Sequence, residues 1–274
     1  MKIFPGILRG CAEGAIDMKT SFAVSTDGTR IAYDISGAGE SIVLLHGGLH
    51  TRQHWHNAGY VERLNKEFKV ITIDIRGNGE SDKYLDPAYY TTKKHCEDIL
   101  AVAAECGIKS FTVWGYSYGA NIGRYLAAKS DLVDKFIILG YTFGPGASGT
   151  FRQFIPDFHD RWVPILQAQA DKTLDVQTLS GKDQEFLKSG EIPIILAWLS
   201  PILDWPPVEP ADLLCPTLWL AGSKNDDVMA NMKEYEANIE STKVKIKVLE
   251  GLDHWHEFAE VDRVLSVVLP FIKS

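Results

Sequence analysis

The sequence contains no long hydrophobic run and no run of Lys or Arg. A membrane-spanning helix needs about 20 consecutive apolar residues, so no membrane partner is expected. The formal net charge of −8, without a basic cluster, also argues against nucleic acid or an anionic membrane surface as the main partner. The expected partner is a small neutral or apolar molecule.

Cysteine is scarce and scattered, with no C-x-x-C pair: the four residues are Cys11, Cys96, Cys106 and Cys215. A chain of 274 residues can bury a large core without disulfides. Reduced thiols and a cytoplasmic location are therefore predicted. Residues 1–17 lack the features of a signal peptide, because Pro5 and Gly6 break the short apolar stretch. They are interpreted as a non-secretory extension of uncertain role.

Metal-binding and dinucleotide-binding patterns are also missing. His50, His54 and His56 have no carboxylate among them and no second histidine group to complete a site. The fragment Gly77-x-Gly79 lacks the third glycine of a dinucleotide loop. No metal or organic cofactor is expected.

Short β-rich runs recur along the chain and alternate with helical patterns. The runs cover residues 21–25, 30–35, 41–46, 69–74, 110–115, 135–140, 216–222 and 244–250. Several are apolar on both faces, which is typical of strands buried between helices. The fold class predicted is α/β, with a mostly parallel eight-stranded sheet and helices on both faces.

Residues 143–210 interrupt this alternation, because they contain helix-like pieces and many aromatics but no strand-like run. We interpret them as a helical cap inserted after strand 6. The predicted division is an extension at 1–17, a core at 18–142 and 211–274, and the cap at 143–210. An apolar substrate pocket is expected between core and cap, lined by Leu49, Tyr116, Phe143, Trp162, Trp198 and Trp255.

Gly115-Tyr116-Ser117-Tyr118-Gly119 lies between a predicted buried strand and a predicted helix. This is the context that a G-x-S-x-G nucleophile elbow requires. Glycines suit a turn so sharp that neighbouring backbone segments leave no room for a Cβ atom. The pattern predicts that Ser117 is a nucleophile.

A serine nucleophile needs a base, and the base needs an orienting group. His254 and His256 follow the last predicted strand, and His254 is the nearer to its end. Asp226 and Asp227 follow the strand at 216–222. Either histidine and either aspartate satisfies the order Ser, Asp, His.

Over residues 20–273 the sequence resembles the α/β-hydrolase superfamily. The resemblance rests on H46-G-G48, D74-I-R-G-N-G-E-S81, G115-Y-S-Y-G119, G222-S-K-N-D-D-V228 and D253-H254. It implies Ser117 as nucleophile, His254 as general base and acid, and Asp226 as the orienting carboxylate. It also implies an oxyanion hole formed by the backbone N–H groups of Gly48 and Tyr118.

The chain departs from the family pattern at two positions. Members commonly carry the acid where this chain has Asn225, so Asp226 is preferred on its Asp-x-Val continuation and Asp227 is the second choice. Members also commonly have glycine before the catalytic histidine, where this chain has Asp253. Asp74, Arg76 and Ser81 are assigned to structure.

The resemblance implies a serine hydrolase, most simply a carboxylesterase that cleaves small to medium acyl esters through an acyl-enzyme. Serine at the elbow argues against the epoxide-hydrolase and haloalkane-dehalogenase branches, which use Asp there. Lactone hydrolysis, C–C bond hydrolysis and perhydrolysis stay open, because they depend on cap residues such as Arg152, Arg161 and Trp162. A slowly turning over ligand receptor is the alternative from another class, and the oligomeric state is unknown.

Overall fold

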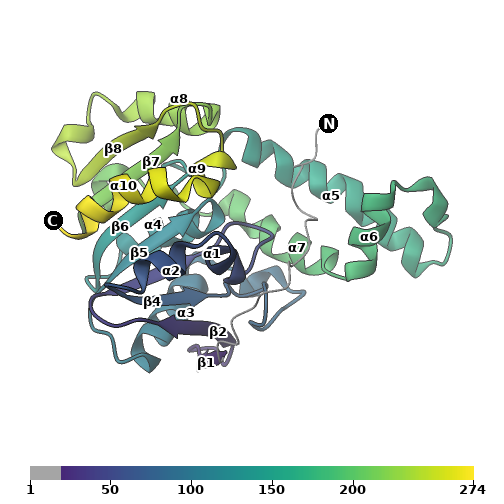
Figure 1. The fold of residues 1–274 in the computed structure, drawn as a ribbon. Helices are drawn as coiled ribbons and strands as arrows, with labels where there is room; N and C mark the ends of the chain where they lie inside the picture. The colour runs from purple at the N-terminus through teal and green to yellow at the C-terminus, as the bar shows by residue number, and fades with distance from the viewer. Residues whose placement is uncertain (1–19) are drawn as a thin grey trace.

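The computed structural model describes residues 20–274, and its centre is one eight-stranded sheet (Figure 1). The strand order is β1, β2, β4, β3, β5, β6, β7, β8. The strands are β1 (Ser21–Val24), β2 (Arg30–Ser36), β3 (Ser41–Leu45), β4 (Lys69–Ile73), β5 (Phe111–Tyr116), β6 (Val133–Leu139), β7 (Thr217–Gly222) and β8 (Val244–Leu249). Within this sheet, as described for residues 20–274, only the pairings of β2 with β1 and with β4 are antiparallel. The mostly parallel α/β fold predicted from the sequence is confirmed. The prediction for residues 1–17 lies outside the described residues.

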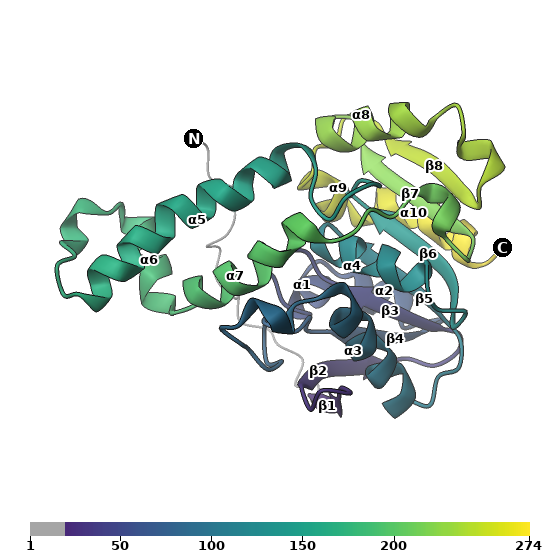
Figure 2. The ribbon, with the colours of Figure 1, turned by 180° about the vertical axis from the view of Figure 1, so that it is seen from behind.

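Alternating side chains of the central strands build two cores, one on each face of the sheet. In β3, for example, Val43 and Leu45 join one core, while Ile42 and Leu44 join the other. The first core is covered by α3 (Thr92–Glu105), α4 (Tyr118–Ala127) and α8 (Asp226–Tyr235). The second is covered by α1 (Gln53–Asn57), α2 (Tyr60–Leu64), α9 (His256–Ala259) and α10 (Val261–Ile272). Figures 1 and 2 show the two layers from opposite sides.

Three helices between β6 and β7 project away from the sheet as an arm (Figures 1 and 2). They are α5 (Gly149–Ala170), α6 (Gly181–Ser189) and α7 (Ile192–Leu199). A bridge between Gly144 and Val208 closes the base of this segment. The segment starts and ends near the boundaries expected for the cap, but its role as a cap and the division of the chain into domains stay predictions.

Among residues 20–274, no single helix has the length and hydropathy needed to cross a membrane. One sharply bent pair, Gly181–Ser189 with Ile192–Asp204, meets those criteria by length and composition only.

Candidate active site

Ser117 lies in the sharp turn between β5 and α4. Its backbone has φ 52° and ψ −115°, a conformation that costs a non-glycine residue roughly 1–3 kcal/mol. The flanking glycines make the turn possible. A Cβ on Gly115 would lie 2.4 Å from Cα of Ala120, and one on Gly119 would lie 2.2 Å from the carbonyl oxygen of Leu45. The turn therefore has the geometry of a nucleophile elbow.

His254 lies within hydrogen-bond distance of the serine. Its Nε2 is 3.1 Å from Oγ of Ser117, and its ring lies against the ring of Tyr116, with centroids 5.2 Å apart. The Tyr116 hydroxyl donates to the backbone carbonyl of His254 at 2.8 Å. Ring and backbone of the histidine are thus both fixed by the residue that precedes the serine.

The other ring nitrogen of His254 contacts Glu257, a residue that sequence reasoning missed. Nδ1 of His254 is 2.8 Å from Oε1 of Glu257, whose side chain is fully buried. The Glu257 carboxylate also accepts hydrogen bonds from Gly222 N at 2.7 Å and from Asn225 Nδ2 at 3.0 Å. A carboxylate that accepts from Nδ1 leaves the Nε2 lone pair facing the serine, which is the tautomer that a general base needs.

The expected contact between Asp226 and His254 is not formed. Asp226 is the exposed first residue of α8. Asp227 lies in the next position and accepts hydrogen bonds from the backbone N–H of Thr150, at 2.9 Å, and from its hydroxyl, so it joins α8 to the start of α5. The position of the family's acid is occupied by Asn225, whose Nδ2 is 3.2 Å from His254 Nδ1.

Asp253 and His256 pair with each other at the protein surface. Oδ1 of Asp253 accepts from the backbone N–H of His256 at 2.9 Å and lies 2.7 Å from Nδ1 of the His256 ring. The backbone bond from His256, followed by its imidazole, lowers the pKa of Asp253. Of the two candidate bases, His254 is the one that reaches Ser117.

Gly48 and Tyr118 lie side by side at the serine. A Cβ on Gly48 would be 3.7 Å from Cβ of Tyr118, and both residues line the same cavity as Ser117. Tyr118 is the first residue of α4, where backbone N–H groups have no partner within the helix. The structure therefore brings the two expected oxyanion residues together.

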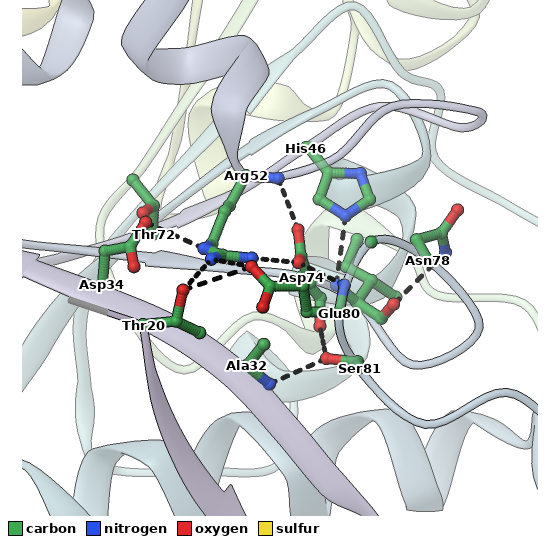
Figure 3. A network of polar contacts seen from close by, with 12 residues as sticks. Thr20, Ala32, Asp34, His46, Arg52, Thr72, Asp74, Asn78, Glu80 and Ser81 are labelled. Carbon is green, nitrogen blue, oxygen red and sulfur yellow. Dashed lines mark hydrogen bonds and ion pairs between the residues drawn. The ribbon is translucent and has the colours of Figure 1, made fainter. Parts of the chain in front are cut away.

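A buried polar network supports the loop that carries Gly48 (Figure 3). The backbone N–H of Arg52 donates to Oδ1 of Asp74 at 2.7 Å, and its guanidinium contacts Asp34, Asp74 and Glu80. Ser81 Oγ donates to the Asp74 carbonyl at 2.6 Å. His46 Nε2 accepts from Ile75 N at 3.0 Å, and burial lowers the pKa of this imidazole. Asp74 and Ser81 thus hold the loop in place.

Arg76, the third residue assigned to structure from the sequence, forms a buried ion pair with Asp98.

A cavity of about 260 Å³ opens at Ser117 and His254. One part of its wall is apolar and comes mostly from the arm, with Phe151, Phe154, Trp198 and Leu199. Another part carries the polar side chains of Thr142, Ser148, Thr150 and Asp227. Among the described residues that line it there is no Lys or Arg.

Four of the six residues expected in the pocket line this cavity: Leu49, Tyr116, Trp198 and Trp255. Phe143 and Trp162 do not. Phe143 is fully buried edge-on against Trp219, and Trp162 packs against Phe186 within the arm. Both serve as packing residues, because an aromatic residue in the sequence does not indicate which neighbour will cover it.

Within the described part of the chain, no group of three or more His, Cys, Asp or Glu residues could hold a metal ion. His50 and His54 stack face to face instead, with centroids 3.8 Å apart.

The elbow, the paired histidine and the parallel sheet together define a class, the α/β hydrolases. The family model described as alpha/beta hydrolase fold matches residues 40–181, more than half of the chain. The chain therefore belongs to the α/β-hydrolase fold family.

Curated relatives match only part of their length. A soluble epoxide hydrolase from Corynebacterium sp. (strain C12) is 30% identical over 114 residues, which cover 41% of this chain and 38% of that protein. An epoxide hydrolase from Vigna radiata has a similar fold, with TM-score 0.70 and 16% identity over 95% of this chain and 99% of that one. A thermophilic esterase from Thermogutta terrifontis also has a similar fold, with TM-score 0.68 and 20% identity over 93% of this chain and 98% of that one. At these identities the two structures show the fold alone.

Proposed function

We propose that this chain is a serine hydrolase whose catalytic triad is Ser117, His254 and Glu257. The observation that carries the proposal is the pair of contacts through one imidazole, 3.1 Å from Nε2 to the serine and 2.8 Å from Nδ1 to a fully buried carboxylate. A serine hydroxyl is a weak nucleophile unless a base removes its proton and a third group orients that base. Glu257 takes the role first expected of Asp226.

The reaction is acyl transfer in two stages. Ser117 Oγ attacks the substrate carbonyl carbon while His254 Nε2 takes the hydroxyl proton, and backbone N–H groups of Gly48 and Tyr118 stabilise the oxyanion. His254 then gives the proton to the leaving-group oxygen, and the alcohol departs. Water attacks the acyl-enzyme by the same route and releases the acid, so no metal or organic cofactor takes part.

The substrate class that fits best is a neutral ester with a small to medium acyl chain. The cavity is small and partly apolar, and among the described residues that line it the one carboxylate is that of Asp227. A substrate that carries its own carboxylate would meet that negative charge without a cation to pair with it. Arg152 and Arg161 do not supply one, since Arg152 is exposed and Arg161 pairs with Asp183 at 2.6 Å. The lack of a cation among the described residues that line the cavity disfavours C–C hydrolysis of acidic diketones. Residues 143–210 act as the cap that completes the acyl site.

The test is steady-state hydrolysis of p-nitrophenyl esters from acetate to dodecanoate, with Ser117→Ala as the matched control. We expect repeated turnover, fastest for short and medium chains. The variant should lose at least about 10³-fold in kcat, because a triad without its nucleophile keeps only the oxyanion hole and binding.

Repeated turnover that survives in Ser117→Ala would overturn the assignment of the nucleophile. A single turnover followed by ligand-dependent loss of thermal stability would instead support a receptor. Styrene oxide serves as the comparison substrate, because several relatives are named epoxide hydrolases while this chain has serine at the elbow. Its hydrolysis in preference to esters would contradict the proposal.

A further inference from the structure

His50 is a polar side chain in the active-site wall that the proposed triad does not use. It lies two residues after Gly48 and lines the cavity together with Ser117 and His254. Its ring stacks on His54, which in turn stacks on Phe258 with centroids 4.1 Å apart. Phe258 follows the triad carboxylate in α9. The imidazole of His50 is therefore held in place by packing, although it forms part of a cavity.

Both ring nitrogens of His50 are available to a ligand. Within residues 20–274 no hydrogen bond joins either of them to another group, whereas both ring nitrogens of His46 are bonded. Burial, with smaller contributions from His46 and His254, lowers the pKa of His50 to about 4. Near neutral pH the ring is thus uncharged and offers one N–H donor and one lone pair.

The neighbours of His50 indicate which part of a substrate it faces. Trp255 lies edge-on to His50 and also packs against His254, with ring centroids 6.1 and 6.3 Å apart. His254 must give its proton to the leaving-group oxygen, so the alcohol part of an ester lies next to His254. Because Trp255 contacts both His50 and His254, His50 lies on the His254 side of the cavity, while Phe151 and Phe154 line the part of the wall formed by the arm.

We infer, resting on the proposed function, that His50 hydrogen-bonds the alcohol part of the substrate. The protein then selects esters whose alcohol carries a hydroxyl or similar hydrogen-bonding group close to the ester oxygen. His50 is a specificity residue, because its bond would form with a part of the substrate that does not react. An alcohol without such a group would leave the buried imidazole without a hydrogen-bond partner in the complex.

A matched pair of substrates tests this directly. 2-Hydroxyethyl butanoate and propyl butanoate have the same acyl chain and the same number of heavy atoms, and they differ by a hydroxyl in place of a methyl group. For each, kcat/KM is measured by pH-stat and divided by the rate constant for hydrolysis by hydroxide, which removes the intrinsic difference in reactivity. We expect the wild-type protein to prefer the hydroxyethyl ester at least about fivefold, the ratio that one net hydrogen bond gives.

Two variants separate hydrogen bonding from packing. His50→Phe keeps an aromatic ring against His54 and should bring the ratio close to one, while His50→Gln, which retains a donor and an acceptor, should keep part of it. His54→Phe is the control, because His54 stacks directly on His50 but does not line the cavity. It should keep the full wild-type ratio.

The inference is overturned if the wild-type protein hydrolyses both esters with a normalised ratio near one, or if His50→Phe retains the preference. Absence of turnover with both butanoates and with every p-nitrophenyl ester is a different result. It would overturn the proposed function itself, and the role of His50 with it.

Discussion

The two sides of the candidate site differ in what fixes them. On the side of the serine, backbone geometry decides: Gly115 and Gly119 lie where a Cβ would collide with Ala120 and Leu45. On the side of the acid, the position of the carboxylate depends only on which side chain is long enough to reach the histidine. Asn225 occupies the expected position, and the carboxylate comes from Glu257 in a neighbouring helix.

This difference shows which features of an active site can be supplied from another position in the sequence. A strained turn needs particular residue types at particular spacings, so the elbow has few alternatives. A carboxylate needs only to reach Nδ1 of the histidine and to have its remaining lone pairs satisfied. Glu257 meets both conditions, because Gly222 N and Asn225 Nδ2 donate to it.

Glu257→Gln should have the largest effect on the acid side. The amide removes the charge that stabilises the imidazolium and no longer selects the required tautomer, so kcat should fall about 10³- to 10⁴-fold. Asp226→Asn is the matched control and should stay within about twofold of wild type, because Asp226 is an exposed residue outside the proposed triad. Steady-state kinetics on one p-nitrophenyl ester compares them. The reverse ranking would return the acid to Asp226.

A smaller effect is expected from moving the carboxylate back to the family position. Asn225 Nδ2 is 3.2 Å from His254 Nδ1, so a carboxylate at residue 225 reaches the imidazole. Asn225→Asp should therefore restore at least about tenfold in kcat when added to Glu257→Gln. Added to the wild-type protein it should reduce kcat, because two adjacent carboxylates disfavour ionisation of both. If Glu257→Gln and the double variant Glu257→Gln/Asn225→Asp have the same kcat, a carboxylate at residue 225 cannot replace the one at residue 257.

The smallest effect concerns stability at the junction between the two sides, where His54 stacks on Phe258. Burial, followed by the neighbouring His50 and His46, lowers the pKa of His54 to about 3, below the usual value near 6.5. Between pH 6.5 and 4 the unfolded chain therefore binds a proton that the folded chain does not, and the free energy of unfolding decreases as pH falls.

His54→Phe should reduce this pH dependence by up to about 1.4 kcal/mol per pH unit. Urea unfolding at pH 7.5 and pH 5 measures it, with the wild-type protein losing more stability on acidification than the variant. Equal losses in the two proteins would show that His54 does not remain neutral in the folded state.

Much of the fold could be predicted because the local patterns were strong. Eight short apolar runs correspond to the eight strands, and the elbow was recognisable from its glycines. Helix α1 was not expected, since five residues give too little periodicity. The arm appeared in the sequence as an interval without strands, although the contacts of its aromatics could not be assigned.

Glu257 was not predicted as the acid, because members of the family commonly carry the acid after an earlier strand. Glu257 is three residues after His254, and residues three apart on a helical turn lie on the same face. That spacing was visible in the sequence. What the sequence does not reveal is the position of Gly222 at the end of β7, where its backbone N–H donates to the Glu257 carboxylate.

In the proposed triad, Glu257 accepts the Nδ1 proton of His254. One-dimensional proton NMR can detect this ring proton as a resonance downfield of the backbone amides when it is held in a charge-assisted hydrogen bond. We expect such a resonance in the wild-type protein and in Asp226→Asn, and its loss in Glu257→Gln and His254→Ala. A resonance that survives in Glu257→Gln and disappears in Asp226→Asn would contradict it.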